Sequence, residues 1–254
     1  MRIAYIGHAT LSVELDGVRI LTDPMLRPRV THLYRRGPLP EGKWIQSIEA
    51  VLISHLHLDH CDIPSLRRLG MKTRMIVPRG AGTLLRRRGF HEVEELDHGE
   101  ATAVKSLTVT ATPAVHSGFR PPLGPTAIAL GFIISGSKRI YFAGDTDLFA
   151  GMADLGSDLD VALLPVSGWG HNVGPGHLDP LRAAEAARLL RPTVAIPIHW
   201  GTFAHVGVRR HDPVLAEPPH LFAQYAAKTA PEVEVVILKP GESVTLFESV
   251  QNDV

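Results

Sequence analysis

The stretch LISHLHLDHCD, residues 52–62, holds three histidines and two aspartates directly after an apolar run. His55 and His57 lie two positions apart, a spacing that points both side chains to the same side of an extended chain. Asp59 and His60 follow in the turn before a helix expected over residues 63–69. Neutral imidazole and carboxylate are the ligands that zinc, manganese and iron accept. The stretch therefore predicts a metal site.

This pattern has a low chance frequency. With 14 histidines and 13 aspartates among 254 residues, H-x-H-x-D-H is expected roughly two times in a thousand chains of this composition. The alternative, a polar surface loop, explains the clustering less well.

Short apolar and β-branched runs predict strands, and several of these runs end near a residue that can bind a metal or a proton. The runs at 2–6, 18–22, 107–112, 139–143 and 193–198 are followed by His8, Asp23, His116, Asp145 and His199. Strands that deliver such residues to one edge are a common way for α/β enzymes to assemble a site.

The remaining runs complete a mixed α/β pattern. Further strands are expected at 11–15, 50–53, 74–77, 127–134, 161–165, 233–238 and 243–247. Helices are expected at 63–69, 82–89, 179–190 and 219–229. The helix at 179–190 is the clearest, because Asp179 can cap it and Pro180 suits its first turn. Residues 24–46 and 118–125 are expected to form long surface loops.

The composition is that of a soluble globular protein with a formal net charge of zero. Zero net charge gives no strong signal for nucleic acid. The one cysteine, Cys61, leaves no partner for an internal disulfide. The first residues lack the apolar stretch of a signal peptide, and no run approaches the ~18 apolar residues of a membrane span. We expect a cytoplasmic protein with no membrane span, and a single domain over residues 1–254.

Four motifs occur in an order that resembles the metallo-β-lactamase superfamily: HLHLDH (55–60), then His116, then GDTD (144–147), then PIHWGTF (197–203). The resemblance runs from about residue 3 to about 247. GHAT (7–10) and ILTDP (20–24) are similar to the branch that holds L-ascorbate-6-phosphate lactonase and N-acyl-phosphatidylethanolamine-hydrolysing phospholipase D. The implied fold is α/β (α+β), a four-layer αββα sandwich.

The resemblance also implies two divalent metal ions that share one bridging carboxylate, with Zn²⁺ as the first expectation and Mn²⁺ or iron as alternatives. The implied ligands are His55, His57 and His116 for one ion, Asp59, His60 and His199 for the other, and Asp145 for both.

Four more residues have implied roles around this centre. Asp23 and His8 would support the ligand histidines through hydrogen bonds or line the pocket floor. His177 would act on the substrate together with Asp59, by stabilising charge or donating a proton. His171 would contact the substrate.

The function that follows is a metal-dependent hydrolase whose dinuclear centre activates a bridging water to cleave an ester, lactone or phosphodiester bond. No G-x-S-x-G motif supplies a competing nucleophile. The expected partner is a small-molecule substrate, phosphate-containing or lipid-like, and a homo-oligomer remains open.

Three alternatives use the same residues. An iron-dependent oxidoreductase could employ the same ligand set, and a nuclease of the same superfamily would share it, although the neutral charge argues against nucleic acid. A non-catalytic scaffold is the third, and the retention of ligating residue types at every implied position argues against it.

Overall fold

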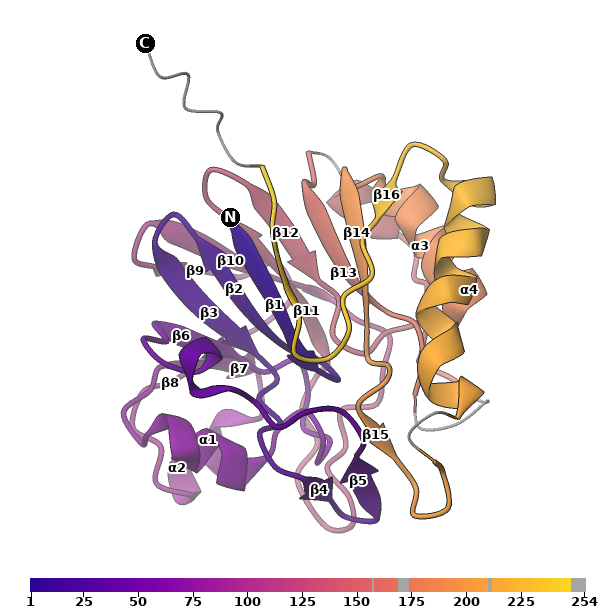
Figure 1. The fold of residues 1–254 in the computed structure, drawn as a ribbon. Helices are drawn as coiled ribbons and strands as arrows, with labels where there is room; N and C mark the ends of the chain where they lie inside the picture. The colour runs from indigo at the N-terminus through magenta and orange to yellow at the C-terminus, as the bar shows by residue number, and fades with distance from the viewer. Residues whose placement is uncertain (157, 169–173, 210–211, 248–254) are drawn as a thin grey trace.

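The computed structural model describes residues 1–156, 158–168, 174–209 and 212–247. Two seven-stranded mixed sheets pack face to face, and helices cover their outer faces (Figure 1). The predicted α/β sandwich with an αββα layer order is confirmed. Among the described residues, no helix combines the length and the apolar composition that crossing a bilayer requires.

The first sheet has the strand order β17-β1-β2-β3-β6-β7-β8. Its strands are β1 (Arg2–Gly7), β2 (Thr10–Leu15), β3 (Val18–Thr22), β6 (Ala50–Leu52), β7 (Met75–Pro78), β8 (Val93–Leu96) and β17 (Ser243–Thr245). The predicted meander with a turn at Asp16-Gly17 forms β1 to β3, and both turn residues have positive φ angles. Positive φ at both turn positions suits the twist of a two-residue hairpin.

The second sheet has the order β16-β14-β13-β12-β11-β10-β9. Its strands are β9 (Ala101–Val104), β10 (Leu107–Pro113), β11 (Leu130–Ser135), β12 (Arg139–Phe142), β13 (Val161–Pro165), β14 (Val194–Ile198) and β16 (Glu234–Val235). The predicted strands at 127–134 and 233–238 are shorter than expected, and β8 and β9 were missed. The sequences of β8 (VEEL) and β9 (ATAV) are rich in glutamate and alanine, which carry a weak strand signal, and pairing with a neighbour stabilises both strands.

Strand direction brings the carboxyl ends together. In the first sheet, β1, β3 and β6 run the same way, because β1 and β3 both pair antiparallel with β2 while β3 and β6 pair parallel. In the second sheet, β10, β12, β13 and β14 run the same way. The residues that follow these strands therefore emerge at one edge of each sheet.

Side-chain alternation divides the core into layers. In β6, Ala50 and Leu52 join the large cluster between the two sheets, whereas Val51 joins the cluster beneath the first helical layer. Strands β6, β13 and β14 are buried on both faces, which is why their sequences are continuous apolar runs.

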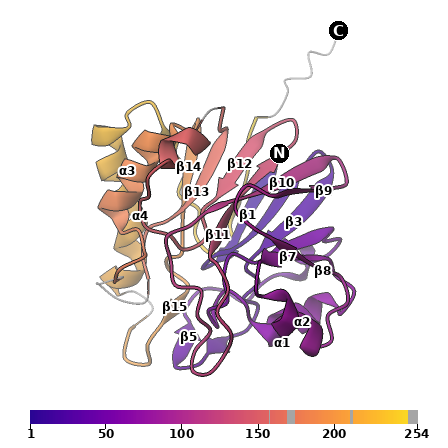
Figure 2. The same ribbon diagram turned by 180° about the vertical axis from the view of Figure 1, so that it is seen from behind.

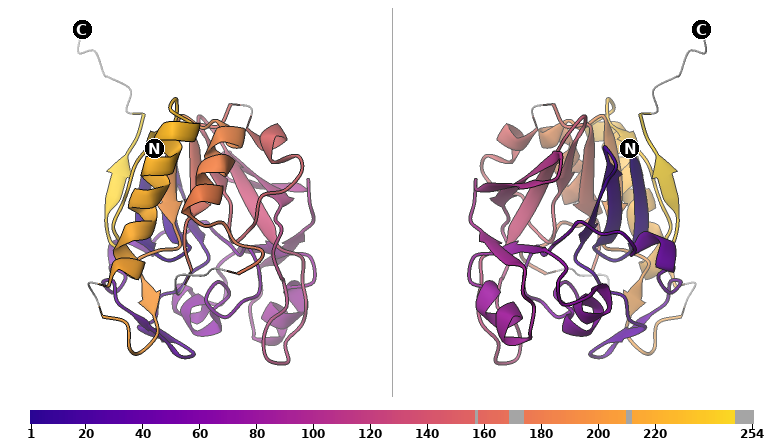
Figure 3. Two further views of the ribbon diagram at one scale, coloured as in Figure 1. Left: turned by 90° about the vertical axis from the view of Figure 1, so that its right-hand side faces the viewer. Right: turned by 90° about the vertical axis from the view of Figure 1, so that its left-hand side faces the viewer.

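Two helices cover each outer face, as Figures 2 and 3 show from behind and from the sides. Helices α1 (Ile63–Leu69) and α2 (Gly82–Arg87) cover the first sheet, and α3 (Pro180–Leu190) and α4 (Pro213–Thr229) cover the second. Asp179 caps α3 as predicted, its carboxylate accepting from the Arg182 N–H at 2.8 Å. Helix α4 begins six residues before the predicted start, because Asp212 caps it and the burial of Pro218 and Pro219 stabilises prolines inside the helix.

Residues 24–46 were expected to form a surface loop, but part of this segment is buried and folded into short strands and a helix. This segment contains β4 (Arg29–Val30), β5 (Leu33–Arg35) and the 3-10 helix η1 (Gly42–Trp44), and β5 pairs with β15 (Phe203–Ala204) in a third, small sheet. Met25, Val30 and Leu33 are buried against Phe203 in a separate apolar cluster. Proline and arginine content suggested exposure, but tertiary contacts bury the apolar residues between them.

Candidate metal centre

The site forms where the two sheets meet at the carboxyl ends of their strands. His8 follows β1 and His199 follows β14, and the His199 N–H donates to the His8 carbonyl at 2.9 Å. This backbone hydrogen bond joins the first sheet to the second. His8, Asp23 and His199 all have positive φ angles (61°, 33° and 65°), so the chain turns sharply after each strand.

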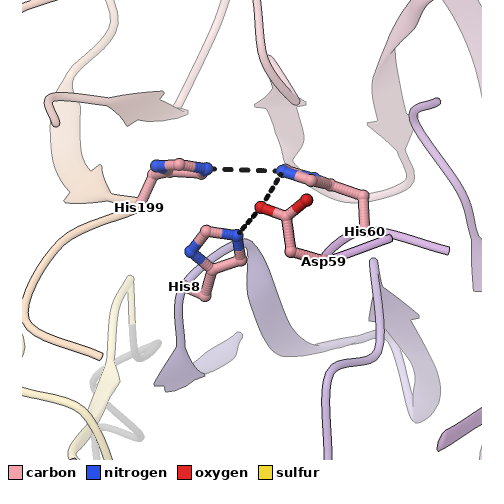
Figure 4. A group of neighbouring side chains, drawn as sticks. All are labelled: His8, Asp59, His60 and His199. Atoms are coloured by element: carbon pink, nitrogen blue, oxygen red, sulfur yellow. Dashed lines mark hydrogen bonds and ion pairs between the residues drawn. The ribbon is translucent and has the colours of Figure 1, made fainter. Parts of the chain in front are cut away.

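One group of donor atoms comes from His8, Asp59, His60 and His199, whose potential ligand atoms all lie within 4.8 Å of one another. Figure 4 shows these side chains pointing toward one another. The His60 Nε2 and His199 Nε2 atoms are 3.3 Å apart, and His60 Nε2 is 3.5 Å from Asp59 Oδ2. His8 Nε2 lies 2.7 Å from the same Asp59 oxygen.

A second group comes from His55, His57 and His116, with potential ligand atoms again within 4.8 Å of one another. The His116 Nε2 and His57 Nδ1 atoms are 3.1 Å apart. The His55 and His57 rings are perpendicular at 4.6 Å between centroids. Both histidines lie beyond β6, which ends at Leu52, so they converge through the loop geometry and not through the predicted strand alternation.

Asp145 lies between the two groups. Its carboxylate oxygens are 3.1 Å from His60 Nε2 and 3.3 Å from His199 Nε2. Asp145 also forms a group with His116 and His177. Its glycine neighbour makes this approach possible, because a Cβ at Gly144 would lie 2.6 Å from the Ser54 Cβ.

Asp23 organises the histidines from behind. Its carboxylate lies 2.7 Å from His60 Nδ1 and accepts hydrogen bonds from the Ser54 N–H at 2.7 Å and the Ser54 hydroxyl at 2.5 Å. The Ser54 Oγ in turn lies 2.9 Å from His55 Nδ1. One buried carboxylate thus orients two imidazoles, one directly and one through Ser54.

The hydrogen bonds determine which ring nitrogens carry lone pairs. His60 Nδ1–H donates to Asp23, and His199 Nδ1–H donates to the Ser167 carbonyl at 2.7 Å. When both rings are neutral, their Nε2 atoms face each other as acceptors at 3.3 Å. Such a contact is repulsive unless a proton or a metal ion lies between the nitrogens.

In the second group too, hydrogen bonds leave a ring nitrogen without its proton facing a neighbouring imidazole. His116 Nδ1–H donates to the Gly176 carbonyl at 2.8 Å, which leaves Nε2 as an acceptor facing His57. His55 Nε2 is buried without a hydrogen-bond partner among the described residues. A buried polar atom without a partner is costly. The donor set therefore fits divalent cations of the kind that imidazole and carboxylate ligate.

The two groups of donor atoms differ in the pKa values of their histidines. Burial lowers the pKa of His116 to about 4 and also lowers the pKa of His55 well below its usual value, so these rings stay neutral. Burial would likewise lower the pKa of His60, but the carboxylates of Asp145 and Asp59 raise it well above the usual range. His60 and His199 hold the pKa of Asp145 well below its usual value despite burial. The centre thus favours positive charge beside two ionised carboxylates.

The other predicted residues have mixed outcomes. His177 is half-buried, with its Nε2 3.6 Å from Asp145 Oδ2 and its Nδ1 3.2 Å from the Pro175 carbonyl. His171 lies outside the described residues. Cys61 is fully buried in the apolar cluster beside α1 and α2 and belongs to none of the donor groups.

Sequence reasoning missed three contributors. Ser54 links Asp23 to His55, and its only signal was its position just before the H-x-H motif. Arg120 donates to the carbonyls of Leu56 and Cys61 at 2.8 and 2.9 Å, on either side of the turn at residues 57–60. The carbonyls that orient His116 and His199 could not be found, because a backbone acceptor leaves no mark in the sequence.

Comparison with known proteins identifies the family. The model of the beta-lactamase superfamily domain matches residues 18–200, which include nearly all of the site. The chain belongs to the metallo-β-lactamase superfamily. The two branch members suggested by the GHAT and ILTDP motifs are not distinguished by this match.

Relatives of this superfamily member align over its whole length. A UPF0173 metal-dependent hydrolase of Methanopyrus kandleri is 33% identical, with 96% of this chain and 99% of the relative covered. A UPF0173 metal-dependent hydrolase of Aeropyrum pernix is 32% identical, with coverage of 95% and 96%. The solved structure of Igni18, a metallo hydrolase from Ignicoccus hospitalis, aligns with a TM-score of 0.72 at 28% identity, covering 96% of this chain and 97% of that one.

Proposed function

We propose that this protein is a metal-dependent hydrolase with a dinuclear centre. The observation that carries the proposal is the pair of facing imidazole nitrogens, His60 Nε2 and His199 Nε2, at 3.3 Å beside the Asp145 carboxylate. In neutral rings both nitrogens are acceptors, so this contact calls for a proton or a metal ion between them, and the neighbouring carboxylates favour that positive charge.

The proposed ligands are those that the sequence predicts, with Zn²⁺ as the first candidate ion. One ion would be held by His55, His57 and His116, the other by Asp59, His60 and His199, and both by Asp145. Each triad lies within one group of closely spaced donor atoms, which supports this assignment. The contacts of Asp145 with His60 and His199, and its place in a group with His116, support its bridging role.

The names of the relatives support hydrolysis as the reaction class. The Methanopyrus kandleri and Aeropyrum pernix proteins are both named metal-dependent hydrolases and align almost end to end with this chain. We propose the same reaction class for this protein. We also propose that it is a single domain that acts on a small molecule in the cytoplasm.

Divalent cations at this site would make water nucleophilic near neutral pH and offset negative charge that develops on the substrate. His8 holds Asp59 in place by donating from Nε2 to Oδ2, so this carboxylate keeps one orientation. Asp59 can then direct a water toward the cleaved bond.

His177 supplies a proton in this proposal. Its Nδ1–H bond to the Pro175 carbonyl fixes the ring with Nε2 facing the centre. A proton held at Nε2 can pass to the leaving-group oxygen when the bond breaks. The cleaved bond would be that of an ester, lactone or phosphodiester, as in the branch that the GHAT and ILTDP motifs resemble.

The test combines metal analysis with activity on generic ester, lactone and phosphodiester substrates. We expect about two zinc ions per chain, loss of turnover with chelator, and recovery when Zn²⁺ is restored. The Asp145→Asn variant should lose metal and at least about 100-fold in kcat/KM, whereas Asp154→Asn, on the 3-10 helix η2 (Met152–Leu155), should not. Equal turnover with and without chelator would refute the proposal, and bound iron with oxygen consumption would replace hydrolysis by oxidation.

A further inference from the structure

A pocket of about 330 Å³ opens beside the proposed centre. His57 and Asp59, two of the proposed ligands, form part of its wall. The pocket lies between the β4–β5 hairpin on one side and the loop at residues 118–125 on the other. A group held in this pocket would therefore extend directly from the atoms that perform the chemistry.

Away from those two residues the lining is mostly apolar, and the exposed residues Thr31 and His32 are its polar members. Val30, Leu33, Leu58, Pro121 and Pro122 supply most of it. Among the described residues that line the pocket there is no lysine or arginine. A phosphate or carboxylate group held against these apolar side chains would lose its hydration without a lysine or arginine to replace it, which is unfavourable. An uncharged apolar group would gain free energy from the same burial.

Both walls are preformed. On the loop side, Arg120 N–H donates to the Pro125 carbonyl at 3.0 Å, and the Arg120 guanidinium bonds to the Leu56 and Cys61 carbonyls. On the hairpin side, the Arg27 guanidinium forms two hydrogen bonds to Asp62, at 2.6 and 2.9 Å. A pocket whose walls are already ordered costs little further entropy on binding.

We propose that the substrate carries a compact, uncharged apolar arm, an alkyl, acyl or aryl group, and that this pocket holds it. The cleavable bond then lies over His57 and Asp59. This inference rests on the proposed hydrolase function and adds the substrate class: an apolar ester or lactone, and not a sugar phosphate or nucleotide.

The first test uses alkyl hydroxamic acids, whose head group binds zinc and whose tail can enter the pocket. Isothermal titration of the zinc-loaded protein with the series from acetohydroxamic to octanohydroxamic acid measures the contribution of the tail. We expect affinity to rise by about fourfold per methylene, which corresponds to about 0.8 kcal/mol, until the pocket is filled. Affinity that does not depend on tail length would overturn the proposal.

Two substitutions locate the tail. Leu58→Ala should weaken hexanohydroxamic acid by about fivefold and change acetohydroxamic acid by less than about twofold. Thr31→Arg, at an exposed lining position, should instead favour succinic monohydroxamic acid, whose tail is anionic. The control is Leu123→Ala, because this side chain is on the same loop, is 95% exposed and does not line the pocket. An equal effect of the control would place the tail elsewhere.

A metal-independent measurement separates this inference from the function on which it rests. With chelator present, 1-hexanol should produce saturable methyl chemical-shift changes at Val30, Leu33 and Leu58 and none at Leu123. These shifts would support the pocket even if acetohydroxamic acid failed to bind, a result that would count against the metal centre alone. Absence of shifts at all three lining residues would overturn the pocket proposal.

Discussion

Asp23 shows how one residue can control a site that it does not enter. It is fully buried and accepts hydrogen bonds from His60 and from Ser54, which contacts His55. Burial raises the pKa of its carboxyl, and the His60 and Ser54 hydrogen bonds oppose that rise. Its role in the proposed centre is to turn the metal-facing nitrogens of both rings inward.

Replacing Asp23 by asparagine tests this role. We expect Asp23→Asn to weaken zinc binding by about 10- to 100-fold, because an amide cannot accept every hydrogen bond that the carboxylate accepts. Competition with a fluorescent zinc chelator measures the affinity. Asp16→Asn, on the exposed turn between β2 and β3, is the matched control and should leave zinc affinity unchanged. Equal affinities for Asp23→Asn and the native protein would contradict the prediction.

Gly144 is the second residue whose size matters. Its φ angle is +61°, and a Cβ would lie 2.6 Å from the Ser54 Cβ. Gly17 has a φ angle of +76° with nothing within 4 Å, so it separates backbone strain from steric clash.

We expect Gly17→Ala to lower the free energy of unfolding by about 1–2 kcal/mol through backbone strain alone. Gly144→Ala should lower it by a further 1–3 kcal/mol, about the cost of overpacking, and should also reduce zinc affinity. Urea unfolding followed by circular dichroism measures both. Equal losses of unfolding free energy in the two variants would mean that Ser54 moves away from the new Cβ at no cost in stability.

At the scale of elements, the loop at 118–125 supports the metal-binding turn. Arg120 is the link, since its guanidinium donates to the carbonyls of Leu56 and Cys61, on both sides of the turn at residues 57–60. The loop was predicted only as a surface segment, and its exposed tip agrees with that prediction: Pro121, Pro122 and Leu123 are all exposed. Its function as a brace depends on a contact across more than 50 positions of sequence.

The Arg120→Met variant removes these bonds while keeping the aliphatic stem. We expect the free energy of unfolding to fall by about 1.5–3 kcal/mol, the usual range for hydrogen bonds to a charged group. Zinc affinity should fall with it, and Arg120→Lys should recover part of both because one donor can still reach a carbonyl. Thermal unfolding and zinc titration of the two variants check the order. A lysine variant no better than the methionine variant would contradict the bracing role.

At the scale of the whole molecule, the proposed metal ions connect the two sheets. Their ligands follow β6 in the first sheet and β10, β12 and β14 in the second. A ligand that binds only the folded state stabilises it by about 2.7 kcal/mol at a free concentration of 100 times Kd. Removal of zinc should therefore lower the Tm by several degrees, since 1 kcal/mol corresponds to about 2–4 °C in a protein of this size. Asp145→Asn should show no such dependence on zinc.

The metal effect should also depend on pH. Carboxylates raise the pKa of His60 and of His199, despite burial, so protons compete with metal ions for these nitrogens over a wide range. The stabilisation by zinc should be largest at high pH and should shrink as pH falls through the raised pKa values of His60 and His199. Differences in Tm between zinc-loaded and chelated samples measure this trend, and calorimetry in two buffers measures the protons released. Stabilisation that is constant with pH would contradict the competition.

Local patterns predicted much of the fold. Helix α1 matches its predicted range, and α3 begins at the proline after its predicted cap, because a capping aspartate followed by proline is a local signal. The short strands β8, β9 and β16 were missed or mispredicted, because their stability comes from neighbours in the sheet. The buried parts of residues 24–46 were also missed, since the Phe203 cluster that covers Val30 and Leu33 lies far along the chain.

For the site, the sequence by itself determined the donor chemistry: H-x-H-x-D-H, and a histidine or aspartate soon after other strands. Only the tertiary structure decided that these donors face one another, because that depends on the shared direction of β1, β3 and β6 and of β10, β12 and β14. The same holds for Ser54, Arg120 and the carbonyls of Ser167 and Gly176. The residue types determine which atoms can bind a metal ion. The distances between these atoms and the directions of their lone pairs are set only when separate segments of the chain pack together.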